Sequence, residues 1–536
     1  MPSSAPIRSN SVWTPLAFPI YRVMWIAMVV SNIGTWMNEV GVTWMMASLA
    51  PSNLMIALIQ TAATLPFLLV GYPAGALGDT VNRRTLLVVL HLWMLATAVW
   101  LSLLTHLELT TEWLLLIATF ALGIGNAMLR PPWAANIPSY VPREQLSNAV
   151  TLNTLSTNMS KAIGPALGGI VIASWGALPV FIINAVSFVF VLVALLVWHP
   201  KLPTLNSVLP VERFVSALKA GLRYTLHEPD LKVVLIRSAA CFFFASAFWS
   251  LIAVILIRDL NASASTYGLL MAVSGLGAVL GAMWLPGLGL RYSRNLQFGA
   301  ATGLYALALL ALSATTNFWL IGILTLLIGI AWIVLFSSMT VTAQLTVPDW
   351  VRARALSIVM LNYGGCTAVG SALWGYLSDV TSVAASIYCA VIGLLATLLL
   401  SKLFPIASEQ KNIPSVTRTG IEPESSIQIA HTRGPVMVTV QYVIPNHNQP
   451  DFLDGMQKIR RTRRRNGAFF WEIFQDAIKP DQFTETFLVE SWLEYLRQRE
   501  RMTDSDMALE KIIAELNSPT HKPAMKHYVA PTRARG

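Results

Sequence analysis

The sequence predicts an all-α polytopic membrane protein with twelve transmembrane helices, followed by a small cytoplasmic α+β module. Hydrophobic residues make up 55% of the 536-residue chain and charged residues 12%, whereas soluble domains carry about 25% charged residues. Apolar runs of membrane-spanning length recur up to Phe404. After Phe404 the chain becomes polar, and short alternating patterns typical of strands appear.

Each apolar run is long enough to cross a hydrocarbon core as a helix. Lysine and arginine lie almost entirely in the loops on one side, which predicts that both termini are cytoplasmic. The loops on the other side contain only Arg258, beside Asp259. The helices are expected at residues 20–49, 54–78, 84–106, 112–132, 144–174, 177–199, 232–257, 265–289, 295–315, 318–345, 351–379 and 381–403.

The chain repeats itself at a shift of 206 residues. The shift aligns the run 164–169, Gly-Pro-Ala-Leu-Gly-Gly, with 370–375, and Gly71 and Gly75 with Gly277 and Gly281. It divides the helices six and six, which predicts one bundle at 1–199, a second at 232–404 and a substrate path between them. The repeat is unequal in charge, because Leu285 stands opposite Asp79.

Three further segments complete the expected domain organisation. Residues 200–231 form a connector between the bundles, with helical spacing that suits a membrane surface. Residues 405–433 are rich in Pro, Ser, Thr and Glu, as in a linker. Residues 434–536 show the order strand, helix, strand, strand, helical segment, strand, which fits a ferredoxin-like α+β fold.

The most distinctive loop lies between the second and third predicted helices. Gly71 and Gly75 fall on one helix face and allow a neighbouring helix to approach closely. Asp79 precedes the next helix, where a carboxylate can cap free backbone N–H groups. Arg83 and Arg84 mark the loop as cytoplasmic.

This loop resembles the one between helices 2 and 3 of the major facilitator superfamily, with Asn82 in place of the usual glycine. Asn tolerates a left-handed backbone best after Gly, so the turn is expected to survive. The resemblance implies that Gly75, Asp79, Arg83 and Arg84 form a conformational-switch loop. Further stretches resemble the bacterial transporters related to the enterobactin exporter, over roughly residues 15–405: 32–39, 149–153, 161–169 and 344–354.

Two other resemblances concern function. The run with Gly164, Pro165, Gly168 and Gly169 is similar to a motif of the proton-coupled exporters in this superfamily. The C-terminal module resembles the fold of antibiotic-biosynthesis monooxygenases. It is therefore expected to be either a cofactor-free enzyme beside the transporter or a dimerising regulatory lid.

Glu39 and Lys161 are the clearest ionisable residues deep in predicted membrane helices. Each lies 18 residues beyond a cytoplasmic-side marker, Tyr21 and Arg143, which places both about 27 Å along their helices. Charges at such depth are costly, so they tend to pair or to face a cavity. We expect Glu39 to be the protonatable carboxylate and Lys161 its partner or a substrate contact; the alternatives are a structural ion pair or a Glu39 that lies outside the membrane core.

Two arginines are weaker candidates for the transport pathway. Arg130, before Pro131 and Pro132, either lines the pathway or marks topology. Arg237 lies near the cytoplasmic end of its helix, where it can snorkel. Several aromatic residues either line a cavity for a bulky, flat substrate or belong to interface belts: Trp36, Trp44, Phe242, Phe243, Phe244, Trp249, Trp332 and Tyr363.

Other function classes find little support in the sequence. No phosphate-binding G-x-x-x-x-G-K-[ST] motif occurs, which disfavours an ATP-driven pump. All three cysteines fall inside apolar runs, so no metal or cofactor site is expected. We interpret the arginine cluster 460–465 as a solvated helix face; the functional alternative is a site that attracts anionic lipid. The nearly balanced charge of the module argues against nucleic acid as a partner.

The sequence therefore predicts a multi-pass transporter of a bacterial inner membrane. We expect a proton-driven exporter of a small molecule, such as a siderophore, drug or secondary metabolite, that works by alternating access. Its expected partners are the lipid bilayer, protons, the substrate and a second copy of the chain through the C-terminal module. No catalytic residue is predicted in the membrane part.

Overall fold

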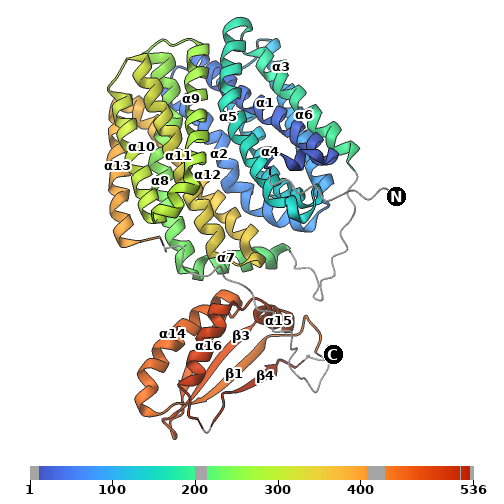
Figure 1. The fold of residues 1–536 in the computed structure, drawn as a ribbon, viewed down its shortest axis with the longest axis vertical. Coiled ribbons are helices and arrows are strands. Elements are labelled where there is room, and N and C mark those ends of the chain that lie inside the picture. The colour runs from blue at the N-terminus through green and yellow to red at the C-terminus, as the bar shows by residue number, and fades with distance from the viewer. Residues whose placement is uncertain (1–10, 199–213, 407–428, 520, 532–536) are drawn as a thin grey trace. The chain divides into compact units, whose positions relative to one another are not determined.

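The computed structural model describes residues 11–198, 214–406, 429–519 and 521–531. A helix is found at each of the twelve predicted membrane positions, with ends that differ by a few residues (Figure 1). These helices are α1 (Pro19–Leu49), α2 (Asn53–Thr80), α3 (Arg83–His106), α4 (Glu112–Asn136), α5 (Leu146–Trp175), α6 (Leu178–Val197), α8 (Pro229–Ala253), α9 (Ala264–Arg291), α10 (Arg294–Ser313), α11 (Phe318–Thr346), α12 (Asp349–Val380) and α13 (Val383–Leu403).

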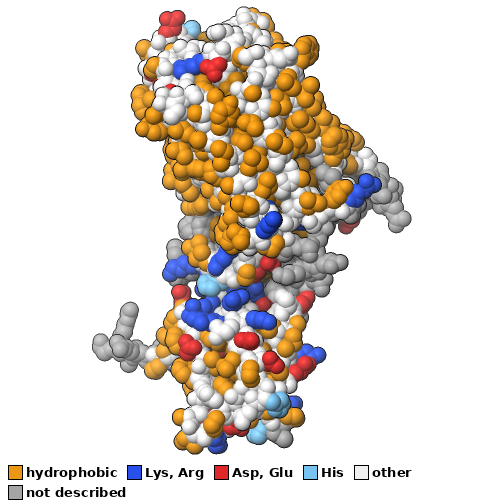
Figure 2. All heavy atoms as spheres, turned by 90° about the vertical axis from the view of Figure 1, so that its left-hand side faces the viewer, with side chains coloured by type: hydrophobic (Ala, Val, Ile, Leu, Met, Phe, Trp, Pro, Cys, Tyr) orange, Lys and Arg blue, Asp and Glu red, His pale blue; other side chains and the backbone are white. Residues whose placement is uncertain are grey.

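Ten helices in the described part of the chain are long and apolar enough to cross a membrane. The other two at predicted positions, α1 and α5, contain Glu39 and Lys161, and α5 is also rich in Asn, Ser and Thr. Figure 2 shows one face of the helical part on which hydrophobic side chains are abundant and charged side chains are few. Such a face suits a surface in contact with lipid.

Shorter elements join the helices. The connector contains α7 (Phe214–His227), and the end of α8 continues as a π-helical stretch, Val254–Asp259. Single-turn π segments inside α-helices are frequently found at functional sites. The remaining short helical turns are Thr14–Ala17, Ile137–Ser139, Arg143–Gln145 and Asn446–Asn448.

Glycines related by the 206-residue shift make equivalent contacts. A Cβ on Gly164 would meet Trp36 of α1, and one on Gly370 would meet Phe243 and Ser246 of α8. Each of these pairs joins helices within one bundle. Gly169 lies against α9 of the second bundle, and Gly375 lies against α2 of the first. These contacts are as expected for two halves related by an axis along the membrane normal.

The C-terminal module consists of β1 (Val436–Val443), α14 (Gln449–Asn466), β2 (Phe470–Gln475), β3 (Gln482–Val489), α15 (Trp492–Glu500), α16 (Asp504–Glu515) and β4 (Ala524–Val529). The sheet is antiparallel, in the order β2-β3-β1-β4, with Val436 opposite both Val489 and Val529. Inward-facing residues of the strands pack with Phe452, Met456 and Ile459 of α14. The small sheet and its helices thus follow the predicted order of elements.

The arginine cluster of α14 is not a uniformly solvated helix face. Arg463 is buried and pairs with Glu485 at 3.0 Å and Glu510 at 2.6 Å. Although burial opposes the charge, these carboxylates hold the pKa of Arg463 well above its usual value. Glu485 also accepts hydrogen bonds from Trp471 and Tyr442. All these partners lie in the module, so the network is internal and stabilises its core.

Contacts between Cα atoms divide the chain into two compact units. The first comprises residues 1–211, 235–340 and 357–408, and therefore most of both helical bundles. The second comprises residues 212–234, 341–356 and 409–536. The second unit therefore contains the C-terminal module together with α7 and the residues around the turn between α11 and α12.

Candidate functional site

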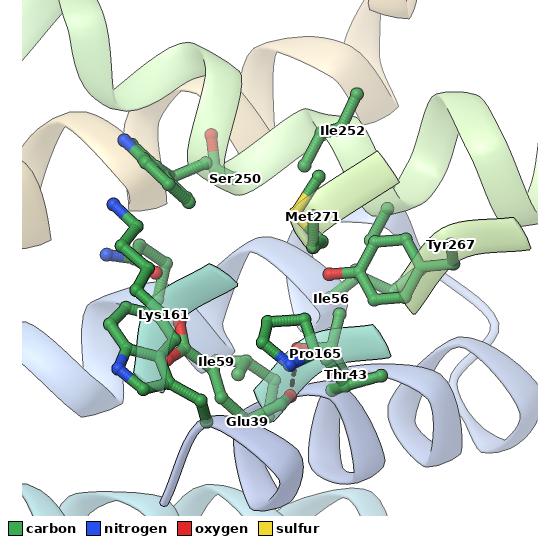
Figure 3. Close-up of a pocket in the computed structure, with 15 residues that line it drawn as sticks. Glu39, Thr43, Ile56, Ile59, Lys161, Pro165, Ser250, Ile252, Tyr267 and Met271 are labelled. Carbon is green, nitrogen blue, oxygen red and sulfur yellow. Dashed lines mark hydrogen bonds between the residues drawn. The ribbon is translucent and has the colours of Figure 1, made fainter. Parts of the chain in front are cut away.

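A small pocket lies between the two bundles (Figure 3). Its volume is about 30 Å³, which is room for one or two water molecules. It is formed by α1, α2 and α5 of the first bundle and by α8 and α9 of the second. The lining residues are Trp36, Glu39, Val40, Thr43, Ile56, Ile59, Gln60, Lys161, Pro165, Trp249, Ser250, Ile252, Ala253, Tyr267 and Met271.

Glu39 and Lys161, the two candidates from the sequence, both line this pocket. Both side chains are half-buried. Their charges interact electrostatically, but no carboxylate in the described part of the chain forms a direct ion pair with Lys161. The pocket therefore holds one carboxylate and one ammonium group that are close but not locked together.

The Lys161 ammonium group lies over aromatic rings from both bundles. Its Nζ is 5.4 Å from the ring centre of Trp36 and 4.5 Å from that of Trp249. Figure 3 shows the side chain reaching from α5 toward Ser250 of α8. Cation–π contacts stabilise an ammonium group that is partly removed from water. Lys161 therefore contacts both halves of the molecule.

Glu39 lies on α1, where Thr43 donates a hydrogen bond of 2.8 Å to its backbone carbonyl. This hydrogen bond holds the Thr43 side chain against the turn of α1 that carries Glu39. Tyr267 points into the pocket from α9 (Figure 3). A carboxylate between helices of both bundles can influence how they sit together through its charge.

The two faces of the run Gly164–Gly169 contact different helices. A Cβ at Gly164 would lie 2.5 Å from Trp36 Cβ, and one at Gly168 would lie 3.1 Å from Met37 Cα, so this face fits closely against α1. Gly169 and the Pro165 carbonyl instead contact Gly268 of α9. Small residues four apart allow such close helix approach.

The predicted switch loop differs from expectation in two details. Helix α2 runs through Asp79 to Thr80, and the cap of α3 is Asn82, whose side chain accepts from the N–H groups of Arg84 and Thr85. Asp79 as the helix cap was therefore wrong. Asn82 has φ −58°, so the expected left-handed turn is also wrong. An amide oxygen caps a helix N-terminus as well as a carboxylate does, with no left-handed residue required.

Arg84 binds the end of α6 within its own bundle. Its Nε donates to Leu195 O at 2.9 Å and its Nη2 to Leu196 O at 2.8 Å. A cation at the last carbonyls of a helix satisfies groups that have no partner in the helix. Gly75 and Arg83 lie at the end of α2 and the start of α3 respectively.

Arg130 and Arg237 lie inside helices. Arg130 is in α4, above the ring of Phe67 at 5.5 Å. Arg237 is 2% exposed, donates to Asn295 and stacks on Phe298 at 4.7 Å. The expected snorkelling of Arg237 is wrong, because α10 supplies both partners within the bundle. Neither arginine lines the pocket of Glu39 and Lys161.

The sequence reasoning missed a second set of contacts between the bundles. The helical part has an end at which α1 meets α2, here named the predicted outer end because the charge pattern places residues 50–53 outside. Asp379 accepts from the N–H groups of Asn53 and Leu54 at 2.7 and 3.0 Å. Arg258 donates to Asn53 Oδ1 at 2.9 Å and to the carbonyls of Ala50 and Pro51. In the sequence, Arg258 is the only basic residue of the predicted outside loops, and this isolation could have indicated a contact there.

A family profile described as Transmembrane secretion effector matches residues 10–535, and so includes the C-terminal module. The Staphyloferrin A transporter of Staphylococcus aureus (strain NCTC 8325 / PS 47) is 23% identical over 66% of this chain and 87% of its own length. The Enterobactin exporter EntS of Shigella flexneri is 26% identical over 56% of this chain and 72% of its own. The resemblance of the module to monooxygenases stays a prediction.

Solved structures of two transporters share the fold of the helical part. A bacterial homolog of the human lysosomal transporter Spinster covers 74% of this chain and 96% of its own, with a TM-score of 0.57 and 15% identity. A bacterial homologue of the iron transporter ferroportin covers 72% and 98%, with a TM-score of 0.55 and 15% identity. The curated relatives are themselves transporters. The chain therefore belongs to the transmembrane secretion effector family and is a multi-pass secondary transporter of the major facilitator superfamily.

Proposed function

We propose that this transporter exports a small molecule, such as a siderophore or a drug, in exchange for protons by alternating access. The main support for this proposal is the shared pocket, where a carboxylate and an ammonium group of the first bundle meet aromatic side chains of the second. The names of the relatives support the substrate class, because they include a staphyloferrin A transporter and an enterobactin exporter.

Glu39 is the proposed proton carrier. When Glu39 is ionised, its charge favours the nearby Lys161 ammonium group; when it is protonated, Lys161 stays as a single uncompensated cation in the pocket. Because the pocket walls come from both bundles, the two protonation states favour different arrangements of the bundles. Protonation from the predicted outer side and release to the cytoplasm would then drive export.

The test uses purified protein in liposomes with an imposed pH gradient. Enterobactin, staphyloferrin A and a cationic dye are loaded in turn as transport probes. Glu39→Gln should lower gradient-driven transport at least tenfold while leaving insertion intact, because the neutral amide mimics the protonated state permanently. Glu112→Gln, in the first turn of α4, is the matched control and should transport normally.

Two results would contradict the proposal. Normal dependence on the pH gradient in Glu39→Gln would make Glu39 structural. Transport of a probe by the unaltered protein with no response to any pH gradient would remove the proton from the mechanism. Exchange of external for internal substrate measured in Glu39→Gln separates the two roles, since exchange needs substrate binding but no net proton movement.

A further inference from the structure

The second compact unit contains a charged surface between the C-terminal module and the transporter's own connector helix. On the transporter side this surface consists of Arg223, Tyr224 and Glu228, in and just after α7, and of Trp350 at the start of α12. On the module side it consists of Arg465, Glu494, Arg501 and Asp506. We call these eight residues the docking surface.

Arg465, near the end of α14, makes the first connection. Its Nη1 donates to Glu228 Oε2 at 2.8 Å, and its Nη2 donates to both carboxylate oxygens of Asp506 at 2.6 Å. The Arg465 side chain is 14% exposed, and those of Glu228 and Asp506 are 13% and 5% exposed. Arg465 therefore joins a carboxylate of the module to one beside the connector, largely away from water.

Glu494 of α15 makes the second connection, in which the module supplies the carboxylate and the connector supplies the arginine. Its Oε1 accepts from Arg223 of the connector at 2.7 Å and from Arg501 of the module at 2.8 Å. Although burial alone would raise the pKa of Glu494, the two arginines hold it below its usual value. A Cβ at Gly467 would meet Glu494 Oε1 at 3.0 Å and Arg223 Nη2 at 3.2 Å, so a small residue leaves room for this pair.

Two aromatic rings, Tyr224 and Trp350, link Arg465 to Arg501. Arg465 stacks on Tyr224 at 5.3 Å, Tyr224 meets Trp350 edge to face at 5.7 Å, and Arg501 stacks on Trp350 at 4.5 Å. Tyr224 belongs to α7 and Trp350 to α12. The module therefore holds together two stretches of the transporter that are far apart in sequence, with one arginine on each ring.

The chemistry of this surface indicates an attachment that can open. Permanent interfaces are mostly apolar, whereas three arginines and three carboxylates supply most of the polar contacts here. Charged surfaces retain favourable hydration when they separate, and their association responds to salt. Loss of one partner from a buried pair is nevertheless costly, because the other charge is left uncompensated.

We propose that the C-terminal module docks reversibly on α7 and the α11–α12 turn through these arginine–carboxylate pairs, as an ionic clamp on the transporter. The partner of the module is therefore its own chain, by way of the connector between the bundles. Docking holds α7 to the start of α12 through Tyr224 and Trp350, so release of the module frees α7. This clamp does not depend on which substrate or ion is transported.

The experiment measures the distance between two spin labels in the full-length protein. The native cysteines are replaced by serine, and labels are attached at Leu222→Cys on α7 and Asp481→Cys on the module, both exposed positions. At low salt the otherwise unaltered protein should give one narrow distance distribution. In 1 M salt, where the Debye length falls to about 3 Å, the distribution should broaden.

Charge reversals locate the clamp. Arg465→Glu and Glu228→Arg should each lower the ratio of docked to undocked protein by about 100-fold or more, since each leaves a like-charge contact in place of a buried pair. Glu228→Arg leaves the sequence of the module unchanged, so it stays informative if Arg465→Glu unfolds the module. Arg461→Glu and Lys219→Glu, at exposed positions on α14 and α7, are the matched controls and should stay docked.

A broad distribution at low salt in the otherwise unaltered protein would overturn the proposal. A narrow distribution in both charge-reversal variants would also overturn it, because docking would then not depend on these pairs. Equal broadening in the reversal and control variants would replace the clamp with a general attraction between charged surfaces and would likewise overturn the residue assignment.

Discussion

Gly268→Ala provides a direct test of how the two bundles close against each other. A Cβ at residue 268 of α9 would lie 2.4 Å from Pro165 O and 2.8 Å from Gly169 Cα, both in α5. The obstructing atoms are backbone, so no change of rotamer can relieve the clash. The helices must move apart by about 1 Å to reach an ordinary van der Waals contact.

The cost of this substitution falls on one conformation only. Overpacking of this kind costs about 1–3 kcal/mol, and every 1.4 kcal/mol corresponds to about a tenfold change in an equilibrium. The gain in helix propensity from Gly to Ala acts in both conformations and cancels. We therefore expect Gly268→Ala to shift the equilibrium about 5- to 150-fold toward separation of α5 and α9.

The assay follows the accessibility of a single cysteine at Ile56. This pocket residue is 3% exposed when the predicted outer end is closed. A membrane-impermeant maleimide added outside whole cells should label Ile56→Cys at least fivefold faster in the Gly268→Ala background. Gly303→Ala is the matched control, because nothing lies within 4 Å of its Cβ position. Equal labelling with and without Gly268→Ala, in protein inserted normally, would refute the closure by α5 and α9.

Two further predictions concern the module and the contacts of Asp379 and Arg258 at the predicted outer end, here called the latch. Asp379→Ala removes the acceptor for two amides of α2, so the same labelling assay should show about a fivefold increase, from a capping loss of about 1 kcal/mol; an unchanged rate would exclude Asp379 from the latch. Burial and Arg499 lower the pKa of His527 below 6.5, so its stabilising contribution is present above pH 6.5 and is lost as pH falls through the lowered pKa. The urea midpoint of the module should therefore drop between pH 7 and pH 5, and His527→Gln should reduce the difference; an equal drop in His527→Gln would exclude His527 as its source.

The positions of the membrane helices were predictable because hydropathy determines them. A segment that crosses a bilayer must satisfy its backbone internally and present apolar side chains to lipid, and both requirements are local in sequence. The polar character of α1 and α5 was equally visible, through Glu39 and Lys161. Their shared pocket followed from equal depth along two helices, although depth alone does not fix how the side chains turn.

Contacts between distant charges were not predictable in the same way. The arginines of α14 occur as a run, and a run of like charges on a helix usually faces water. Arg463 and Arg465 instead face carboxylates supplied by β3, α16 and the connector. Sequence spacing gives the helix face of each arginine, but only tertiary structure shows which acid lies opposite. The same limit applies to Asp379, whose partners lie in the other bundle.

One face of α5 connects the pocket to the closure of the bundles. Lys161, Pro165 and Gly169 lie four residues apart, so they share one face of this helix. Lys161 reaches into the pocket, while the carbonyl of Pro165 and the backbone of Gly169 touch α9. A Cβ on Gly275 of α9 would lie 2.5 Å from the carbonyl of Lys161 itself. Any change in the spacing of α5 and α9 therefore moves the backbone that carries the pocket cation, so charge in the pocket and closure of the bundles can influence each other without an intervening element.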